Sequence, residues 1–211
     1  MRRDEKEASK LLKEYSALAP MYDQRWATYL DASFEMTFEI VSSLPARRVL
    51  DVACGTGRLL ELLARQSEHV ALTGIDRVPA MLEVAKKRLY QRAALLEGEA
   101  QKLPFDDAKF CLVTSTNALH YFPNVDTALR EIRRVISPGG NLIITDWCRD
   151  YFWMKVLNGL LPWTRHAHVH TFSVIELKRC LVEAGFSIVN EKKRKIDWFW
   201  GLMTIHATPL S

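Results

Sequence analysis

The sequence predicts an α/β protein with a Rossmann-like, doubly wound sheet. Three observations support this fold class. From residue 48 onward, short apolar runs alternate with helix-like segments; the first run ends in the glycine turn Gly55-Thr-Gly57; and an acidic residue, Asp76, ends the second run. Strands that alternate with helices form mostly parallel sheets whose two faces are covered, which explains apolar runs without a period of two.

The periodicity of apolar residues places the elements in chain order. Pro20 ends the first helix, Pro79 begins the helix after the second strand, and Ser137-Pro-Gly-Gly140 stops the helix before the fifth strand. Ser173 and Glu176 form a capping box, and Gly185 follows that helix. We expect helices at 7–19, 27–44, 58–64, 79–89, 125–136 and 173–184. We expect parallel strands at 48–53, 70–75, 94–97, 110–116 and 141–147, then an antiparallel C-terminal hairpin of strands at 186–190 and 196–207.

Composition sets the class of protein. The chain has 211 residues, 48% hydrophobic and 26% charged, which is the balance of a globular protein. A net charge of +4 is too small to indicate nucleic-acid binding. The N-terminal residues have no apolar signal segment, the apolar stretch 151–163 is interrupted by polar residues, and the four cysteines form no C-x-x-C pair. We therefore expect a reduced, cytoplasmic protein.

The glycine turn predicts a nucleoside site. Glycine at 55 and 57 lets the backbone approach a ligand, and Asp76 stands where an acid accepts hydrogen bonds from ribose hydroxyls. The alternative is a tight turn with a capping aspartate. Leu60 replaces the third glycine of a dinucleotide site, and no phosphate-loop lysine follows the turn. Asp51 beside the turn suits a cationic ligand such as S-adenosylmethionine, and we favour that cofactor over NAD.

These segments resemble a known family. Val49-Leu-Asp-Val-Ala-Cys-Gly-Thr-Gly57 resembles motif I of class I S-adenosylmethionine-dependent methyltransferases, in particular the methyltransferase type 11 group with the quinone-biosynthesis (UbiE-like) enzymes. Ala53 replaces a frequent glycine of that motif, and Glu99 replaces a usual aspartate. Further matching segments are Gly74–Asp76 with Pro79–Leu82, Gly98–Phe105, Phe110–Phe122, Leu129–Gly140, and, like the mobile lid of the family, Tyr15 with Ala19–Asp23.

The resemblance implies a domain organisation and a cofactor site. It implies one domain over residues 1–211: a helical lid (1–44), a cofactor-binding core (45–147), and an acceptor-side insertion with the final strands (148–211). The cofactor would be S-adenosyl-L-methionine, with S-adenosyl-L-homocysteine as product. The residues implied to bind it are Tyr22, Asp51, Ala53, Gly55, Gly57, Asp76, Arg77, Met81, Glu99, Ala100 and Asn117.

Methyl transfer is an in-line displacement with a neutral leaving group, so alignment matters most and a base is needed only for an acceptor that holds its proton tightly. His120, after the fourth strand, and Asp146, at the end of the fifth, are the candidate catalytic residues; packing on a helix start and capping are their alternatives. The candidate substrate-binding residues are Trp26, Trp147, His166 and His170. The run His166-Ala-His-Val-His170 also fits a metal site, but no acidic residue or cysteine completes it nearby, and we predict no metal.

Aromatic residues and a basic run mark the last third of the chain. Five of the six tryptophans lie from Trp147 onward, which favours a small lipophilic or aromatic acceptor. The run Lys192–Lys195, close to Trp198, is either a solvated loop or a contact with an anionic membrane surface. RNA or protein methylation and cofactor binding without catalysis remain alternatives, although Asn117-Ala-Leu-His120 lacks the Pro-Pro motif of such methyltransferases. No nucleic-acid partner is expected, and the oligomeric state is left open.

Overall fold

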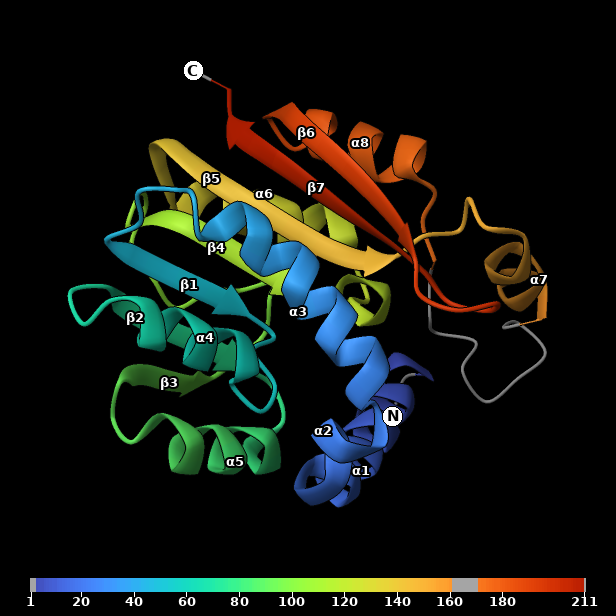
Figure 1. The fold of residues 1–211 in the computed structure, drawn as a ribbon, viewed down its shortest axis with the longest axis horizontal. Helices are drawn as coiled ribbons and strands as arrows, with labels where there is room; N and C mark the ends of the chain where they lie inside the picture. Colours follow the sequence, from blue (N-terminus) through green and yellow to red (C-terminus); the bar gives the residue numbers. More distant parts are fainter. Residues whose placement is uncertain (1–2, 161–170, 211) are drawn as a thin grey trace.

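The computed structural model describes residues 3–160 and 171–210, with the side chains of the first helix from residue 10 onward. A seven-stranded sheet forms its centre, in the order β3-β2-β1-β4-β5-β7-β6 (Figure 1). The strands are β1 (Arg48–Val52), β2 (Ala71–Asp76), β3 (Ala93–Glu97), β4 (Phe110–Thr116), β5 (Ile136–Trp147), β6 (Phe186–Lys195) and β7 (Gly201–Pro209). The helices are α1 (Arg3–Leu18), η1 (Ala19–Met21), α2 (Tyr22–Arg25), α3 (Ala27–Val41), α4 (Arg58–Gln66), α5 (Pro79–Leu89), η2 (Leu119–Tyr121), α6 (Val125–Val135), α7 (Phe152–Leu160) and α8 (Val174–Glu183).

The strand directions confirm the predicted fold class. Strands β1 to β5 pair in parallel, and β7 pairs antiparallel with both β5 and β6. The chain moves outward from β1 through β2 to β3 and then returns to place β4 on the other side of β1. This reversal leaves a crevice at the carboxyl ends of β1 and β4, the position at which open α/β sheets bind ligands.

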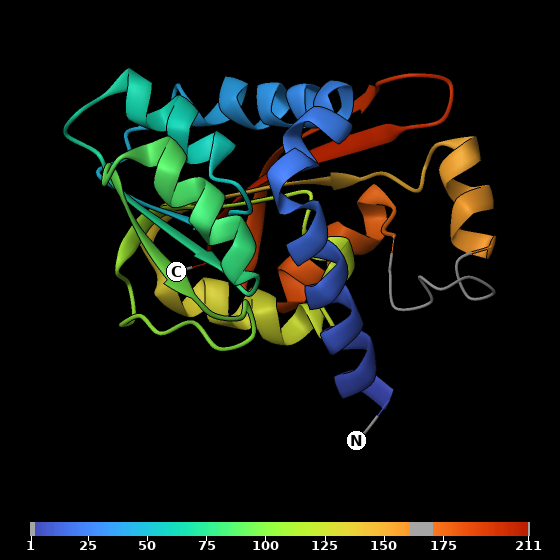
Figure 2. The ribbon, with the colours of Figure 1, turned by 90° about the horizontal axis from the view of Figure 1, so that it is seen from below.

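Helices cover both faces of the sheet. Figure 2 shows α3, α4 and α5 on one face and α6 and α8 on the other. The first layer buries Leu60 and Leu63 of α4 against the sheet, and the second buries Leu129 and Ile132 of α6. Each pair is spaced by three residues, which places both side chains on the same face of their helix. The predicted capping box of α8 is confirmed, because Ser173 accepts from the Glu176 N–H.

The largest departures from the expected elements lie in the last third of the chain. Helix α7 was not expected, and β6 extends to Lys195, so the basic run is part of a strand and not a loop. Charged residues have low strand propensity, but β6 is an edge strand paired with the buried β7, where solvated lysines are tolerated. Strand β7 correspondingly starts later, at Gly201. Within the described part of the chain, every helix is too short or too polar to cross a bilayer.

Gly74 in the middle of β2 allows a stability prediction. A Cβ at this position would lie 2.7 Å from Cys54 Sγ, 2.8 Å from Leu60 Cδ1 and 2.9 Å from Leu95 Cδ2. Gly74→Ala should therefore lower the free energy of unfolding by about 1–3 kcal/mol, as other overpacked cores do. Urea unfolding followed by circular dichroism measures the change. The control is Gly159→Ala in α7, where a Cβ meets nothing within 4 Å, and which should leave the stability equal or slightly higher. Equal stabilities of the two variants would contradict the prediction.

Candidate active site

The loop between β1 and α4 enters the left-handed region three times, with φ of +59° at Ala53, +52° at Gly55 and +77° at Gly57. A Cβ on Gly55 would meet nothing within 4 Å, so the backbone conformation and not space requires glycine there. A Cβ on Gly57 would lie 3.0 Å from the Cβ of Ala85. Gly57 therefore allows α4 and α5 to pack closely, and it does not line the pocket described below.

The carboxylate of Asp76 joins two loops. Its Oδ2 accepts the N–H of Gly55 and its Oδ1 accepts the N–H of Val78, each at 2.8 Å. Burial raises the pKa of Asp76, although these two backbone hydrogen bonds oppose the rise. An ionised carboxylate accepts about four hydrogen bonds, so lone pairs remain for the hydroxyl groups of a ligand.

Asp51 brings a second buried carboxylate to the same end of the sheet. Its Oδ1 accepts a hydrogen bond from Thr114 Oγ1 at 2.7 Å. Burial raises the pKa of Asp51 to about 7, and the nearby charge of Asp76 adds to the rise. Among the described residues no lysine or arginine forms an ion pair with Asp51, so the pocket holds a buried acid that a cationic ligand group would stabilise.

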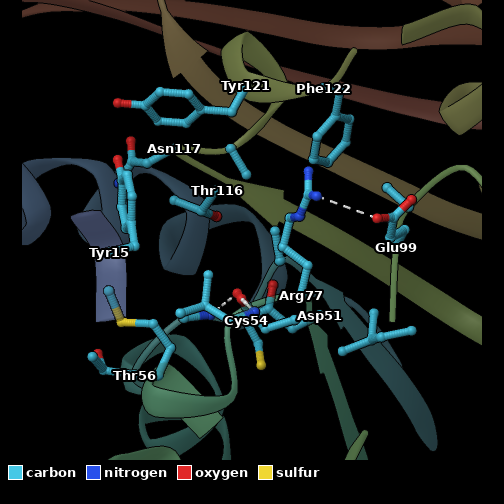
Figure 3. Close-up of a pocket in the computed structure, with 18 of the residues that line it drawn as sticks. Tyr15, Asp51, Cys54, Thr56, Arg77, Glu99, Thr116, Asn117, Tyr121 and Phe122 are labelled. Atoms are coloured by element: carbon cyan, nitrogen blue, oxygen red, sulfur yellow. Dashed lines mark hydrogen bonds and ion pairs between the residues drawn. The ribbon is translucent and has the colours of Figure 1, made fainter. Parts of the chain in front are cut away.

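These groups open into a pocket at the carboxyl ends of β1, β2 and β4 (Figure 3). It encloses about 1000 Å³, its open mouth included, which suits a small-molecule ligand. Except for Gly57, all the residues predicted to bind the cofactor line it: Tyr22, Asp51, Ala53, Gly55, Asp76, Arg77, Met81, Glu99, Ala100 and Asn117.

An ion pair forms one wall of the pocket. Arg77 Nη2 lies 3.3 Å from Glu99 Oε1, and Figure 3 shows the pair across the pocket from Tyr15 and Tyr121. Arg77 Nε is sealed from solvent and has no hydrogen-bond partner in the part of the chain that the structure describes. A buried N–H of this kind costs about 1–3 kcal/mol when it is left unpaired, so this donor is available to a ligand acceptor.

The N-terminal helices close the pocket from above. Asp23 of α2 accepts from Thr56 Oγ1 at 2.7 Å and from Arg88 Nη2 at 2.5 Å. Arg88 also donates to the carbonyl oxygen of Thr56 at 2.8 Å. This network ties α2 to the glycine loop and to α5. The same helices contribute Leu11, Tyr15, Leu30 and Phe34 to the lining.

Three tyrosines line the side of the pocket that the N-terminal helices cover. The ring of Tyr15 lies 5.8 Å from that of Tyr22 and 5.5 Å from that of Tyr121, between centroids. Burial raises the pKa of all three phenols, so they keep their protons. Tyr121 and Phe122 also line the pocket, although neither was expected at the site. Their position directly after the fourth strand, at the ligand-binding edge, was the available signal.

His120 and Asp146 form a buried pair next to this pocket. His120 Nδ1 lies 2.5 Å from Asp146 Oδ1, and each side chain is 2% exposed. The backbone N–H of His120 donates to Asp146 Oδ2 at 3.3 Å. Neither residue lines the pocket, but His120 adjoins Tyr121, which does, with ring centroids 4.2 Å apart. His120 Nε2 has no hydrogen-bond partner among the described residues.

Trp147 connects this pair to the pocket. Its ring stacks on His120 at 4.0 Å, and its Nε1 donates to Tyr29 Oη at 2.7 Å. Tyr29 in turn donates to Oδ1 of Asn117, which lines the pocket, at 2.5 Å. Trp26, 37% exposed, does not line the pocket. The predictions for His166 and His170, and the question of a metal at His166–His170, fall outside the described residues.

The fold and pocket thus define a doubly wound α/β protein with an acidic pocket at the carboxyl ends of its parallel strands. Residues 50–144 match the family model described as "Methyltransferase domain". A demethylmenaquinone methyltransferase from Thermus thermophilus is 32% identical over 165 residues, 67% of this chain and 75% of that protein. A demethylmenaquinone methyltransferase from Thermotoga maritima is 37% identical over 108 residues, 51% of this chain but only 47% of that protein.

The fold has solved counterparts as well. A methyltransferase from Thermotoga maritima superposes with a TM-score of 0.73 at 21% identity, covering 92% of this chain and 97% of that one. The chain belongs to the family of S-adenosylmethionine-dependent methyltransferases that contains the demethylmenaquinone methyltransferases. The resemblance that motif I indicated is thereby confirmed.

The two hydrogen bonds to Asp76 lead to a prediction that needs no ligand. Asp76→Asn places an amide NH₂ against either the Gly55 or the Val78 N–H, which leaves one buried donor unpaired. The free energy of unfolding should fall by about 1–3 kcal/mol. Urea unfolding at neutral pH measures it. Asp106→Asn, at an exposed acid, is the control and should change stability by less than about 0.5 kcal/mol; a similar loss in both variants would refute the role of Asp76.

Proposed function

We propose that this chain is a single-domain enzyme that transfers a methyl group from S-adenosylmethionine to a small lipophilic, hydroxylated aromatic acceptor. Its three parts would be the lid (1–44), the cofactor core (45–147) and the acceptor side (148–211). The observation that carries the proposal is the His120–Asp146 pair, 2.5 Å apart, which adjoins an acidic pocket and is backed by the ring of Trp147. The demethylmenaquinone methyltransferases among its relatives are named for a lipophilic quinone, whose reduced form, the quinol, is a hydroxylated aromatic compound.

The pocket residues fit the cofactor. Asp51 is a buried acid without a cationic partner in the described chain, and it would hold the ammonium group of the methionine moiety. Asp76 retains lone pairs for the ribose hydroxyls, and Arg77 Nε and the Glu99 carboxylate offer a donor and an acceptor to the adenine edge. Met81 also lines the pocket, where its thioether could contact an aromatic base. When bound, S-adenosylmethionine supplies a methyl group on a positively charged sulfur, which an electron-rich acceptor atom displaces in line.

On the acceptor side, His120 would accept a proton from the acceptor, and Asp146 would orient His120. Asp146 accepts from the Nδ1–H of His120, which leaves Nε2 as the basic nitrogen. An acceptor hydroxyl placed against Nε2 would give its proton to His120, and the charge that develops on the acceptor would then favour attack on the methyl group. Asp146 would stabilise the imidazolium that forms, and Trp147 would provide an apolar wall for an aromatic ring.

Cofactor binding should depend on pH through Asp51. Burial raises its pKa to about 7 in the free protein, and a bound ammonium group favours the ionised form. The affinity for S-adenosylmethionine should therefore fall as the pH drops below 7 and Asp51 becomes protonated. Between pH 7.0 and 5.5 we expect about a tenfold loss of affinity, because the α-amino group of the ligand stays protonated over this range. Isothermal titration calorimetry with S-adenosylmethionine and S-adenosylhomocysteine measures it.

Two controls make the pH test specific. Asp51→Asn should bind more weakly and lose most of the pH dependence, whereas Asp106→Asn should keep both the affinity and the dependence of the parent. NAD should not bind. The proposed function is wrong if neither sulfur ligand binds, or if NAD binds in their place.

Replacing His120 should separate catalysis from cofactor binding. We expect His120→Asn to lower kcat by about 10²–10⁴-fold, and Asp146→Asn to lower it by a smaller factor. The dissociation constant for S-adenosylmethionine should stay nearly unchanged in both variants. Transfer of a labelled methyl group to a panel of quinols and phenols is the assay. Added imidazole should restore part of the activity of His120→Gly, which a purely structural role would not produce. Full activity of His120→Asn would exclude His120 as the base.

A further inference from the structure

We propose that the face formed by α7 and the tip of the β6–β7 hairpin docks the protein on an anionic lipid surface. We call this face the α7–hairpin patch and define it by five apolar side chains: Phe152, Trp153, Val156, Leu160 and Trp198. Figures 1 and 2 both show α7 beside the hairpin tip, at one end of the molecule and away from the helical layers. The docking itself does not depend on the acceptor; its use for substrate capture rests on the proposed function.

The patch is exposed although it is apolar. Phe152 is 69% exposed, Trp198 68%, Leu160 56%, Trp153 41% and Val156 37%. Within α7 only Met154 is buried. The rings of Trp153 and Trp198 lie 5.6 Å apart, so the two segments form one continuous surface. Tryptophan at the edge of an apolar helix face is typical of elements that lie in the membrane interface.

Two lysines lie near the patch, but most residues of the basic run 192–195 are already paired with acids. Lys192, Lys193 and Arg194 pair with Glu39, Asp150 and Glu35 at 3.0, 3.1 and 2.6 Å, respectively. Lys155 on α7 and Lys195 at the end of β6 form no ion pair with the described residues. The acid at the tip, Asp197, accepts from the N–H groups of Phe199 and Trp200. Lys155 and Lys195 are therefore the cations placed to meet lipid phosphates.

A chain of aromatic contacts leads from the patch to the candidate base. Trp198 contacts Phe199 at 5.6 Å and Phe199 contacts Trp200 at 5.0 Å, between ring centroids. Trp200 contacts Trp147 at 4.9 Å, and Trp147 stacks on His120 at 4.0 Å. A surface that binds lipid at Trp198 is thus continuous, ring by ring, with the wall beside His120. On the proposed function, this row of rings links the lipid-facing patch to the acceptor side of the site.

The size of the patch favours a bilayer over a protein partner. A standard protein interface uses about 20–30 residues on each side, whereas this patch has five large apolar side chains on one short helix and one turn. An interfacial helix needs only one apolar face, which enters about 5–10 Å into the boundary between headgroups and acyl chains. Flanking lysines then contact the phosphates.

Vesicle binding tests the proposal directly. The full chain is mixed with phosphatidylcholine vesicles, with and without phosphatidylglycerol, and the bound fraction is measured by flotation at low and physiological salt. We expect binding to the anionic vesicles that weakens with salt. Phe152→Ser/Trp198→Ser should reduce it at least about tenfold. Lys155→Gln/Lys195→Gln should reduce it about tenfold on anionic vesicles and not on neutral ones.

The matched control is Ile175→Ser/Val189→Ser, which removes two apolar side chains that are 80% and 55% exposed elsewhere on the surface. It should bind vesicles as the parent does, and thermal melts should show every variant folded. Absent vesicle binding, or equal binding by both double serine variants, overturns the proposal. So does a dimer of the parent that Phe152→Ser/Trp198→Ser dissociates in light scattering, because a second copy then covers the patch. Binding of S-adenosylmethionine is measured separately by calorimetry. If the cofactor binds but the vesicles do not, the docking proposal fails while the proposed function stands.

Discussion

The carboxylate of Asp76 stands at the start of a chain of contacts on which the pocket depends. It fixes the N–H of Gly55, and with it the left-handed turn of the glycine loop. The next residue of that loop, Thr56, holds Asp23 of α2, and Arg88 closes the network between them. One acid at the end of β2 therefore stabilises the conformation of the glycine loop. Through Thr56, Asp23 and Arg88, that loop is connected to the N-terminal helices that cover the pocket.

The same end of the sheet buries two carboxylates, and their burial is electrostatically unfavourable. Asp51 and Asp76 are both buried, and burial raises the pKa of each because the interior solvates a carboxylate poorly. Replacing Asp51 by an apolar residue would remove this desolvation cost. A protein that retains such a group generally does so at a functional site. Two buried acids at this position would favour a cationic ligand before it binds, which is the electrostatic form of preorganisation.

How well the sequence predicted each part depended on the range of the interactions. The glycine loop, the parallel strands and the capping box of α8 follow from neighbouring residues, and all of them are present. The charged run of β6 reads as a loop because its strand pairing comes from the buried β7. Helix α7 was not expected, although Phe152, Val156 and Leu160 recur at helical spacing. The contact between Tyr29 and Asn117 joins residues 88 positions apart, so no local pattern could reveal it.

That contact also relates the two halves of the site to each other. Burial raises the pKa of Tyr29 well above its usual value, so its hydroxyl remains both a donor and an acceptor. It donates to Asn117, which lines the pocket, and accepts from Trp147, whose ring stacks on His120. Because Tyr29 lies in the first turn of α3, directly after α2, a movement of the N-terminal helices would disturb both bonds. The helices that cover the pocket proposed for the cofactor are therefore coupled, through one hydroxyl, to the wall proposed for the acceptor.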